Sequence, residues 1–265
     1  MNDHQTRFWE LFFEVYEHLP RQGPGSRAST ERALRLCVGL PPAPLIADLG
    51  CGVGRQTLDL ADLITGSIIA IDSHPPFIEQ LRATLVAHGL EQRVQAQVGD
   101  MAHLDWPAER YDLVWSEGAL YNLGLGKALQ VCRRLLRPGG CLVFTDAVWR
   151  KPNPPPEIKA SFDLDYPTMG TVGEAISAIQ LGGFELLGHF TLPDEAWWDD
   201  FLLPMEQRIM TLRQTYANDA EALAVLDPLA QEPDMHRRYS DYYAYEFFVV
   251  RRPVSELSRP AFTPI

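Results

Sequence analysis

The glycine-rich stretch from Ala43 to Thr57 constrains the fold more than any other part of this chain. A short apolar run at residues 45–47 ends in Asp48, and a helical pattern of leucines begins near Gln56. Between them, glycines occupy alternate positions: Gly50, Gly52 and Gly54. This order predicts a buried strand, a tight turn and a helix, in which backbone N–H groups at the positive helix end approach a ligand closely. The alternative interpretation is a tight turn that binds nothing.

Downstream of this turn, strand and helix patterns alternate. Apolar strands are expected at residues 67–71, 94–98, 111–115 and 141–145, with helices at 76–88 and 127–136 between some of them. Continuous apolar strands joined by helices indicate a parallel sheet that is covered on both faces. Further along, the pattern predicts a helix at 171–181, a strand at 184–192, two or three helices up to about residue 241, and a final strand at 242–251.

Five of the predicted strands are followed within two residues by an acid. In a parallel sheet these strand ends share one edge, where ligands bind. Carboxylates that converge there suit a ligand rich in hydroxyls, amines and positive charge, although each acid can also cap the helix that follows it. The acids are Asp48, Asp72, Asp100, Glu117 and Asp146.

Composition narrows the class of partner. The 265 residues include 35 acidic and 23 basic ones, for a net charge of -12. This balance argues against nucleic acid or a membrane as the main partner, because phosphate binding needs clustered Lys and Arg. The four cysteines lack zinc-ligand or disulfide spacing, and neither a secretory signal nor a bilayer-spanning run is evident. We therefore expect a cytoplasmic protein without a metal site.

Residues 45–147 resemble the class I S-adenosylmethionine-dependent methyltransferases, in particular the type-11 group. Asp48 to Gly54 fits the first motif of that family, and residues 135–140 fit the turn before its fifth strand. Residues 23–26, 115–124 and 239–248 are similar to a bacterial subgroup of unknown substrate. The resemblance implies an α/β fold with a seven-stranded, mostly parallel Rossmann-like sheet whose last strand is antiparallel. N-terminal helices and a helical insertion before the last strand complete this expected fold.

The same resemblance implies S-adenosylmethionine as the cofactor and a small-molecule methyl acceptor. Asp72 would bind the ribose hydroxyls, and Asp100 would accept from the adenine amine while Met101 packs on the ring. The remaining expected cofactor-binding residues are Asp48, Gly50, Cys51, Gly52, Gly54, Gln56, Ser73 and Glu117. Candidate catalytic residues are Glu117, Tyr121 and Asp146, with His189 as a further candidate base.

We expect three parts of the chain. Residues 1–40 form an N-terminal helical cover, residues 41–252 the methyltransferase domain with a helical lid insertion at about 193–241, and residues 253–265 a tail. Five aromatic residues are expected either to line an acceptor pocket or to pack in the core: Trp149, Tyr166, Trp197, Trp198 and Phe201.

Two other functions remain open on the sequence. One is a non-catalytic S-adenosylmethionine-binding or regulatory protein on the same fold. The other is an NAD-dependent oxidoreductase, which the sequence supports less well. The dinucleotide fingerprint places two residues between its second and third glycines, whereas only Val53 separates Gly52 from Gly54.

Overall fold

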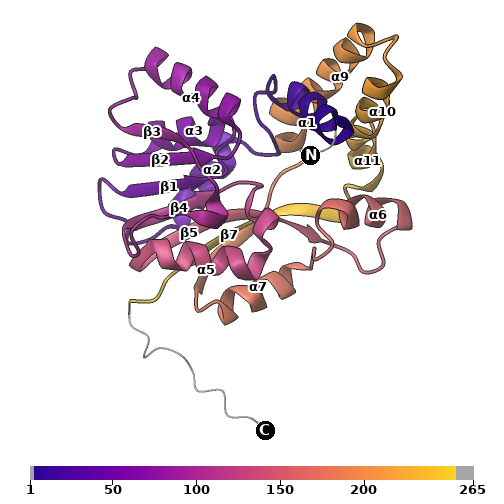
Figure 1. Cartoon of the computed structure of the whole chain (residues 1–265). Coiled ribbons are helices and arrows are strands. Elements are labelled where there is room, and N and C mark those ends of the chain that lie inside the picture. Colours follow the sequence, from indigo (N-terminus) through magenta and orange to yellow (C-terminus); the bar gives the residue numbers. More distant parts are fainter. Residues whose placement is uncertain (1–2, 255–265) are drawn as a thin grey trace.

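A seven-stranded sheet forms the centre of the protein in the computed structural model, which describes residues 3–254 (Figure 1). The strand order is β3-β2-β1-β4-β5-β7-β6. Neighbouring strands from β3 to β5 are parallel, and β7 is antiparallel to both β5 and β6. The predicted fold class is therefore confirmed. The strands are β1 (Leu45–Leu49), β2 (Ser67–Asp72), β3 (Val94–Val98), β4 (Tyr111–Ser116), β5 (Leu136–Trp149), β6 (Glu185–Thr191) and β7 (Tyr243–Arg251).

Helices cover both faces of this sheet, as expected for strands that are apolar throughout. One buried cluster joins Ile46 and Trp115 of the sheet to Leu60. The other joins Leu49 to Leu129 and to the helix that precedes β6. The covering helices are α2 (Arg27–Leu36), α3 (Arg55–Leu63) and α4 (Pro75–Ala87) on the first face, and α5 (Leu125–Leu135) and α7 (Val172–Leu181) on the second. Two short 3-10 turns, η1 (Met101–His103) and η2 (Leu120–Leu123), follow β3 and β4.

A second group of helices lies beyond the carboxyl ends of the central parallel strands. In Figure 1, α1 (Asp3–Tyr16) lies beside two helices of the insertion, and Arg7 pairs there with Asp219 at 3.2 Å. The insertion comprises α8 (Glu195–Trp197), a π-helical turn (Trp198–Leu202), α9 (Leu203–Thr215), α10 (Ala220–Leu229) and α11 (Glu232–Tyr239). Within residues 3–254, no helix is both long and apolar enough to cross a membrane.

Two elements differ from the sequence-based expectation. The fifth strand was expected at 141–145 after a turn at 135–140, but β5 spans Leu136–Trp149. It begins early because Leu136 already pairs with Tyr111 of β4, and it extends to Trp149 because its antiparallel pairing with β7 continues beyond the end of β4 at Ser116. The proline-rich stretch 151–156 leads into α6 (Pro156–Asp165), which was not predicted. Proline fits the first turn of a helix, where its missing N–H has no partner to lose. The expected tail lies almost entirely outside the described residues.

Candidate functional site

The glycine turn is fixed to the end of the neighbouring strand β2. Its three glycines have φ values of 73°, 55° and 86°, in the left-handed region that glycine adopts without strain. The amides of Gly50 and Cys51 both donate to the carbonyl of Ile71 at 2.9 Å, and the Gly52 amide donates to Asp72 Oδ2 at 2.9 Å. A side chain at Gly54 would lie 2.3 Å from a Leu81 methyl group. The turn therefore holds its shape through Asp72, the last residue of β2.

Asp48 lies beneath this turn and not on its surface. It is fully buried, and its carboxylate accepts hydrogen bonds from Thr57 Oγ1 at 2.6 Å and Gln56 Nε2 at 3.5 Å. Burial raises the pKa of Asp48 to about 7. Gln56 also donates to the Cys51 carbonyl at 3.2 Å, and burial raises the pKa of the Cys51 thiol. Asp48, which we expected to bind the cofactor, is thus placed to support the turn from within.

Asp72 lies at the open side of the same turn. Its second oxygen accepts from the His74 amide at 2.9 Å, and the His74 ring stacks on Phe13 with ring centroids 3.7 Å apart. His74 also contacts Glu17 at 2.7 Å. The N-terminal helix region therefore packs directly beside the end of β2, and Ser73 is exposed between these groups.

Asp100 and Met101 follow the next strand outward. Asp100 caps the η1 turn by accepting from the Ala102 amide at 2.8 Å, and it contacts His103 Nδ1 at 2.7 Å. The hydrogen bond with His103 lowers the pKa of Asp100. Its side chain is exposed, and Met101 packs partly buried against the second core. Of the two, Asp100 remains open to a ligand from solvent.

Glu117, expected in both the cofactor and the catalytic set, is bound by protein donors. Its Oε1 accepts from Trp115 Nε1 at 2.9 Å and from Thr30 Oγ1 at 3.2 Å, and Oε2 accepts from Arg21 Nη1 at 3.1 Å. Burial raises the pKa of Glu117, and the Arg21 charge opposes this shift. The Arg21 guanidinium, 3% exposed, also binds Asp59 at 2.9 Å. Glu117 therefore anchors the N-terminal segment.

Arg21 was not predicted to be a site residue. The sequence feature that could have indicated its role is its position between the two predicted N-terminal helices, directly before the glycine- and proline-rich residues 23–26. Its Nε is buried and, among the described residues, has no hydrogen-bond partner. The nearest carboxylate oxygen, Asp200 Oδ2, lies 4.0 Å from this Nε, and Arg21 lines a small cavity at the glycine turn.

The segment at residues 21–25 covers the glycine turn. Gln22 Oε1 accepts from the Val53 amide at 2.9 Å, so the side chain occupies the approach to the turn. The insertion supports this segment through hydrogen bonds from the Arg21 amide to the Asp200 carbonyl and from the Gly25 amide to the Ala196 carbonyl. The cavity enclosed beneath measures about 70 Å³. It is lined by Arg21, Gln22, Gly23, Pro24, Gly50, Cys51, Gly52, Gln56, Glu117 and Gly118.

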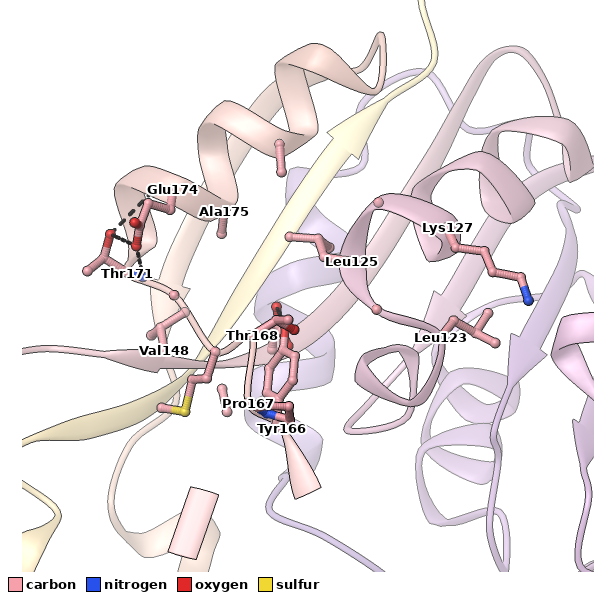
Figure 2. A pocket seen from close by; sticks show the side chains of 17 residues that line it. Leu123, Leu125, Lys127, Val148, Tyr166, Pro167, Thr168, Thr171, Glu174 and Ala175 are labelled. Atoms are coloured by element: carbon pink, nitrogen blue, oxygen red, sulfur yellow. Dashed lines mark hydrogen bonds between the residues drawn. The ribbon is translucent and has the colours of Figure 1, made fainter. Parts of the chain in front are cut away.

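A larger cavity of about 570 Å³ lies between α5, the overhanging end of β5, the residues after α6, and α7 (Figure 2). Asp146, 6% exposed, lines it, and its Oδ2 accepts from the Tyr166 hydroxyl at 3.0 Å. Burial raises the pKa of Asp146 to about 7. The ring of Tyr121, another candidate catalytic residue, lies 5.5 Å from that of Tyr166.

Most of the expected pocket aromatics pack against other rings. Trp197 is buried and stacks on Tyr245 and His236, with centroids 5.0 and 4.3 Å apart. Phe201 is also buried, and Trp149 packs against the ring of Phe162. Of these five aromatic residues, only Tyr166 lines the 570 Å³ cavity.

His189 lies far from the glycine turn. It is on β6, at the edge of the sheet, and its Nδ1 contacts Glu246 at 2.5 Å. Four strand positions separate β6 from β1, or about 19 Å at the usual strand spacing. The structure therefore does not place His189 at the expected site. In the part of the chain that the structure describes, no group of three or more His, Cys, Asp or Glu residues is arranged to hold a metal ion.

Comparisons with known proteins agree with this geometry. Residues 46–140 match the model of a methyltransferase domain family. The match identifies these residues as a methyltransferase domain, and the sheet order and the glycine turn agree with that assignment. The finer placement in the type-11 group stays a prediction.

Among curated proteins, the chain is 30% identical over 141 residues to an uncharacterized methyltransferase, YodH, of Bacillus subtilis, covering 53% of this chain and 59% of that protein. It is 34% identical over 114 residues to a dimethylglycine N-methyltransferase of Parasynechococcus marenigrum, covering 43% and 41%. The alignments thus span about half the length of these relatives.

Solved structures share the fold over most of the chain. A methyltransferase from Geobacter sulfurreducens, in complex with S-adenosyl-L-homocysteine, has a TM-score of 0.74 at 21% identity and covers 91% of this chain and 97% of its own. YjhP from E. coli has a TM-score of 0.76 at 20% identity, with coverage of 91% and 98%.

Proposed function

We propose that this protein transfers a methyl group from S-adenosylmethionine to a small-molecule acceptor. The observation that carries the proposal is the meeting of the Gly50–Gly54 turn with Asp72 at the carboxyl edge of β1 and β2, beneath a buried Arg21. The strand order reverses beside this edge, between β1 and β4, and sheets of this type bind their ligands at the carboxyl ends of the strands next to such a point.

The residues at this edge fit the cofactor. The Nε–H of Arg21 faces Asp200 Oδ2 at 4.0 Å without a hydrogen bond, so it is left to donate to the methionyl carboxylate, and Glu117 and Asp59 hold the guanidinium in place. Asp72 has lone pairs left for the ribose hydroxyls after its two amide bonds. When bound, the cofactor supplies a methyl group on a positively charged sulfur, which nearby carboxylates stabilise. Transfer needs the acceptor atom, the methyl carbon and the sulfur in line, and orientation alone lowers such barriers by up to roughly 7–11 kcal/mol.

Cofactor entry requires the cover to open. The cavity at the turn holds about 70 Å³, whereas small-molecule sites typically measure about 300–1,000 Å³. Gln22 fills the approach to the turn, and residues 196–200 hold the segment that carries it. We therefore propose that the N-terminal residues 1–40 and the insertion at about 193–241 act together as a lid over the cofactor.

Calorimetry tests the cofactor assignment directly. We expect S-adenosylmethionine and S-adenosylhomocysteine to bind, and NAD not to bind. Asp72→Ala should weaken S-adenosylmethionine binding about tenfold to a few hundredfold, because a hydrogen bond to a charged group contributes roughly 1.5–3 kcal/mol. Asp163→Ala, which removes an exposed acid of α6, is the matched control. Binding of NAD alone, or an unchanged affinity in a folded Asp72→Ala variant, would contradict the assignment.

A non-catalytic S-adenosylmethionine-binding protein is distinguished by turnover. An enzyme incubated with S-adenosylmethionine and fractionated metabolite extract should release S-adenosylhomocysteine. Cofactor binding without release from any fraction would favour the binding protein.

A further inference from the structure

The 570 Å³ cavity around Asp146 is built by four separate elements. Its walls come from the start of α5, the end of β5, residues 166–171 and the first turns of α7 (Figure 2). The apolar contribution comes from Leu123, Leu125, Val148, Met169, Ala175 and Ala178. A cavity of this size and lining fits the body of a small apolar molecule.

The charges around the cavity are unbalanced in favour of a cation. Asp146 is the buried carboxyl within it, and none of the ion pairs in the described structure includes Asp146. Glu174 contributes a second carboxyl at the rim, where it accepts from the amide and hydroxyl of Thr171. Lys127 is the one cationic lining residue, and Figure 2 shows its side chain extending away from Tyr166.

The position of Asp146 connects this cavity to the cofactor edge. Strand β4 ends at Ser116 opposite Phe144, so Asp146 stands on the part of β5 that overhangs β4. The Gly118 amide donates to Thr145 Oγ1 at 2.7 Å, and Gly118 also lines the small cavity at the glycine turn. The two cavities are therefore separated by residues 118–124, whose terminal glycines have φ values of 65° and 71°.

We propose that this cavity binds an amine with an apolar body, and that the ammonium group of this ligand rests on the Asp146 carboxylate. Tyr166 positions the carboxylate through its 3.0 Å hydrogen bond, and the apolar walls hold the ligand body. Because residues 118–124 stand between this cavity and the glycine turn, the proposal concerns binding of the amine and does not depend on methyl transfer to it.

Binding of n-hexylamine tests the proposal, with 1-hexanol and hexanoate as probes of the same length. We expect hexylamine to bind more tightly than either. Asp146→Asn should weaken hexylamine binding at least tenfold, because the lost interaction involves a charged group, and should leave 1-hexanol binding unchanged. Asp163→Asn, on the surface of α6, should change neither. Equal hexylamine affinity in Asp146→Asn and in the unmodified protein, or a preference for hexanoate, would overturn the proposal.

The pH dependence supplies a test that needs no variant. Hexylamine stays charged near neutral pH, like a lysine side chain. Because burial raises the pKa of Asp146 to about 7, the ionised fraction of Asp146 increases from about pH 6 to about pH 8, and hexylamine affinity should increase with it, by up to about tenfold. A flat profile would count against the carboxylate.

Other ionisable groups near Asp146 are distinguished in the same experiment. Tyr166 donates to it, Glu174 and Lys127 lie at the rim, and Glu246 is its cross-strand neighbour, held by His189 and Thr191. A pH slope that originates in the His189–Glu246 pair would persist in Asp146→Asn, and this result would overturn the proposal. Loss of the slope in that variant supports it. Calorimetry with S-adenosylmethionine is independent of this result, so failure of the cofactor assignment is recognised separately.

Discussion

Removal of the Arg21 charge tests most directly how residues 21–25 are held over the glycine turn. The Arg21→Met substitution keeps most of the side-chain length but removes the cation that binds Asp59 at 2.9 Å and Glu117 at 3.1 Å. All three side chains are at most 7% exposed, so the substitution leaves the carboxylates of Asp59 and Glu117 buried without this cation. The cation that still contacts Asp59 is Arg27, at the longer distance of 3.7 Å. Breaking a buried pair from one side costs about 3–5 kcal/mol. This is a large share of a typical free energy of unfolding of about 5–15 kcal/mol.

The assay is urea unfolding together with amide hydrogen exchange. We expect a lower unfolding free energy and faster exchange in residues 21–25, since release of this segment hydrates both carboxylates. Arg35→Met is the control, because Arg35 and Glu31 form an exposed pair on α2, worth about 0.3–0.5 kcal/mol. The reasoning is refuted if Arg21→Met costs no more than Arg35→Met and leaves the exchange of residues 21–25 unchanged.

The same variant has a predicted pH dependence. Burial raises the pKa of Glu117, and the Arg21 charge opposes this shift. Without Arg21 nothing from that side chain opposes it, so Glu117 binds a proton more readily in the folded variant than in the unfolded chain. Protonation removes the uncompensated charge. The stability difference between Arg21→Met and the unmodified protein should therefore be smaller at about pH 5 than at about pH 8. A difference that grows as the pH falls would contradict this account.

Two further predictions concern buried groups. The pKa of Asp48 is about 7 in the folded protein against about 3.9 in an unfolded chain, so the folded state binds more protons between these values. Its contribution to stability therefore falls as the pH rises through this range, and Asp48→Asn should flatten the profile measured by urea unfolding; parallel profiles would refute the assignment. Trp197→Ala should cost about 3–5 kcal/mol because it empties a buried stack, and should impair acceptor turnover more than cofactor binding, whereas Trp198→Ala, at a half-buried site, should cost less. Equal unfolding midpoints for the two variants would show that the stack contributes little.

Much of the fold can be predicted from local patterns in the sequence. Apolar runs of strand length, separated by helix-length segments, allow few arrangements other than a parallel sheet with helices on both faces. The alternating glycines predict the turn after β1, because the backbone there needs left-handed conformations and leaves no room for a side chain beside Leu81. The sequence also predicts acids near the carboxyl ends of the strands, although Asp48, Asp72 and Asp146 lie within β1, β2 and β5 and not after them. Helix α6 was not predicted because prolines dominate its start. In a sequence, proline can mark either the end of a helix or its first turn, and the structure shows that here it marks the first turn.

Tertiary structure decided what each acid does. The sequence places Asp48, Asp72 and Glu117 at one sheet edge, but burial beneath the turn occupies Asp48, and contact with the N-terminal segment occupies Glu117. Asp146 lies on the opposite face, with α5 and α7, because strand residues alternate between faces. Arg21 and Glu117 are 96 residues apart in the chain, and no local pattern predicts their contact. Only packing brings such groups together, since the energy of a buried charge depends on every neighbour that excludes water from it.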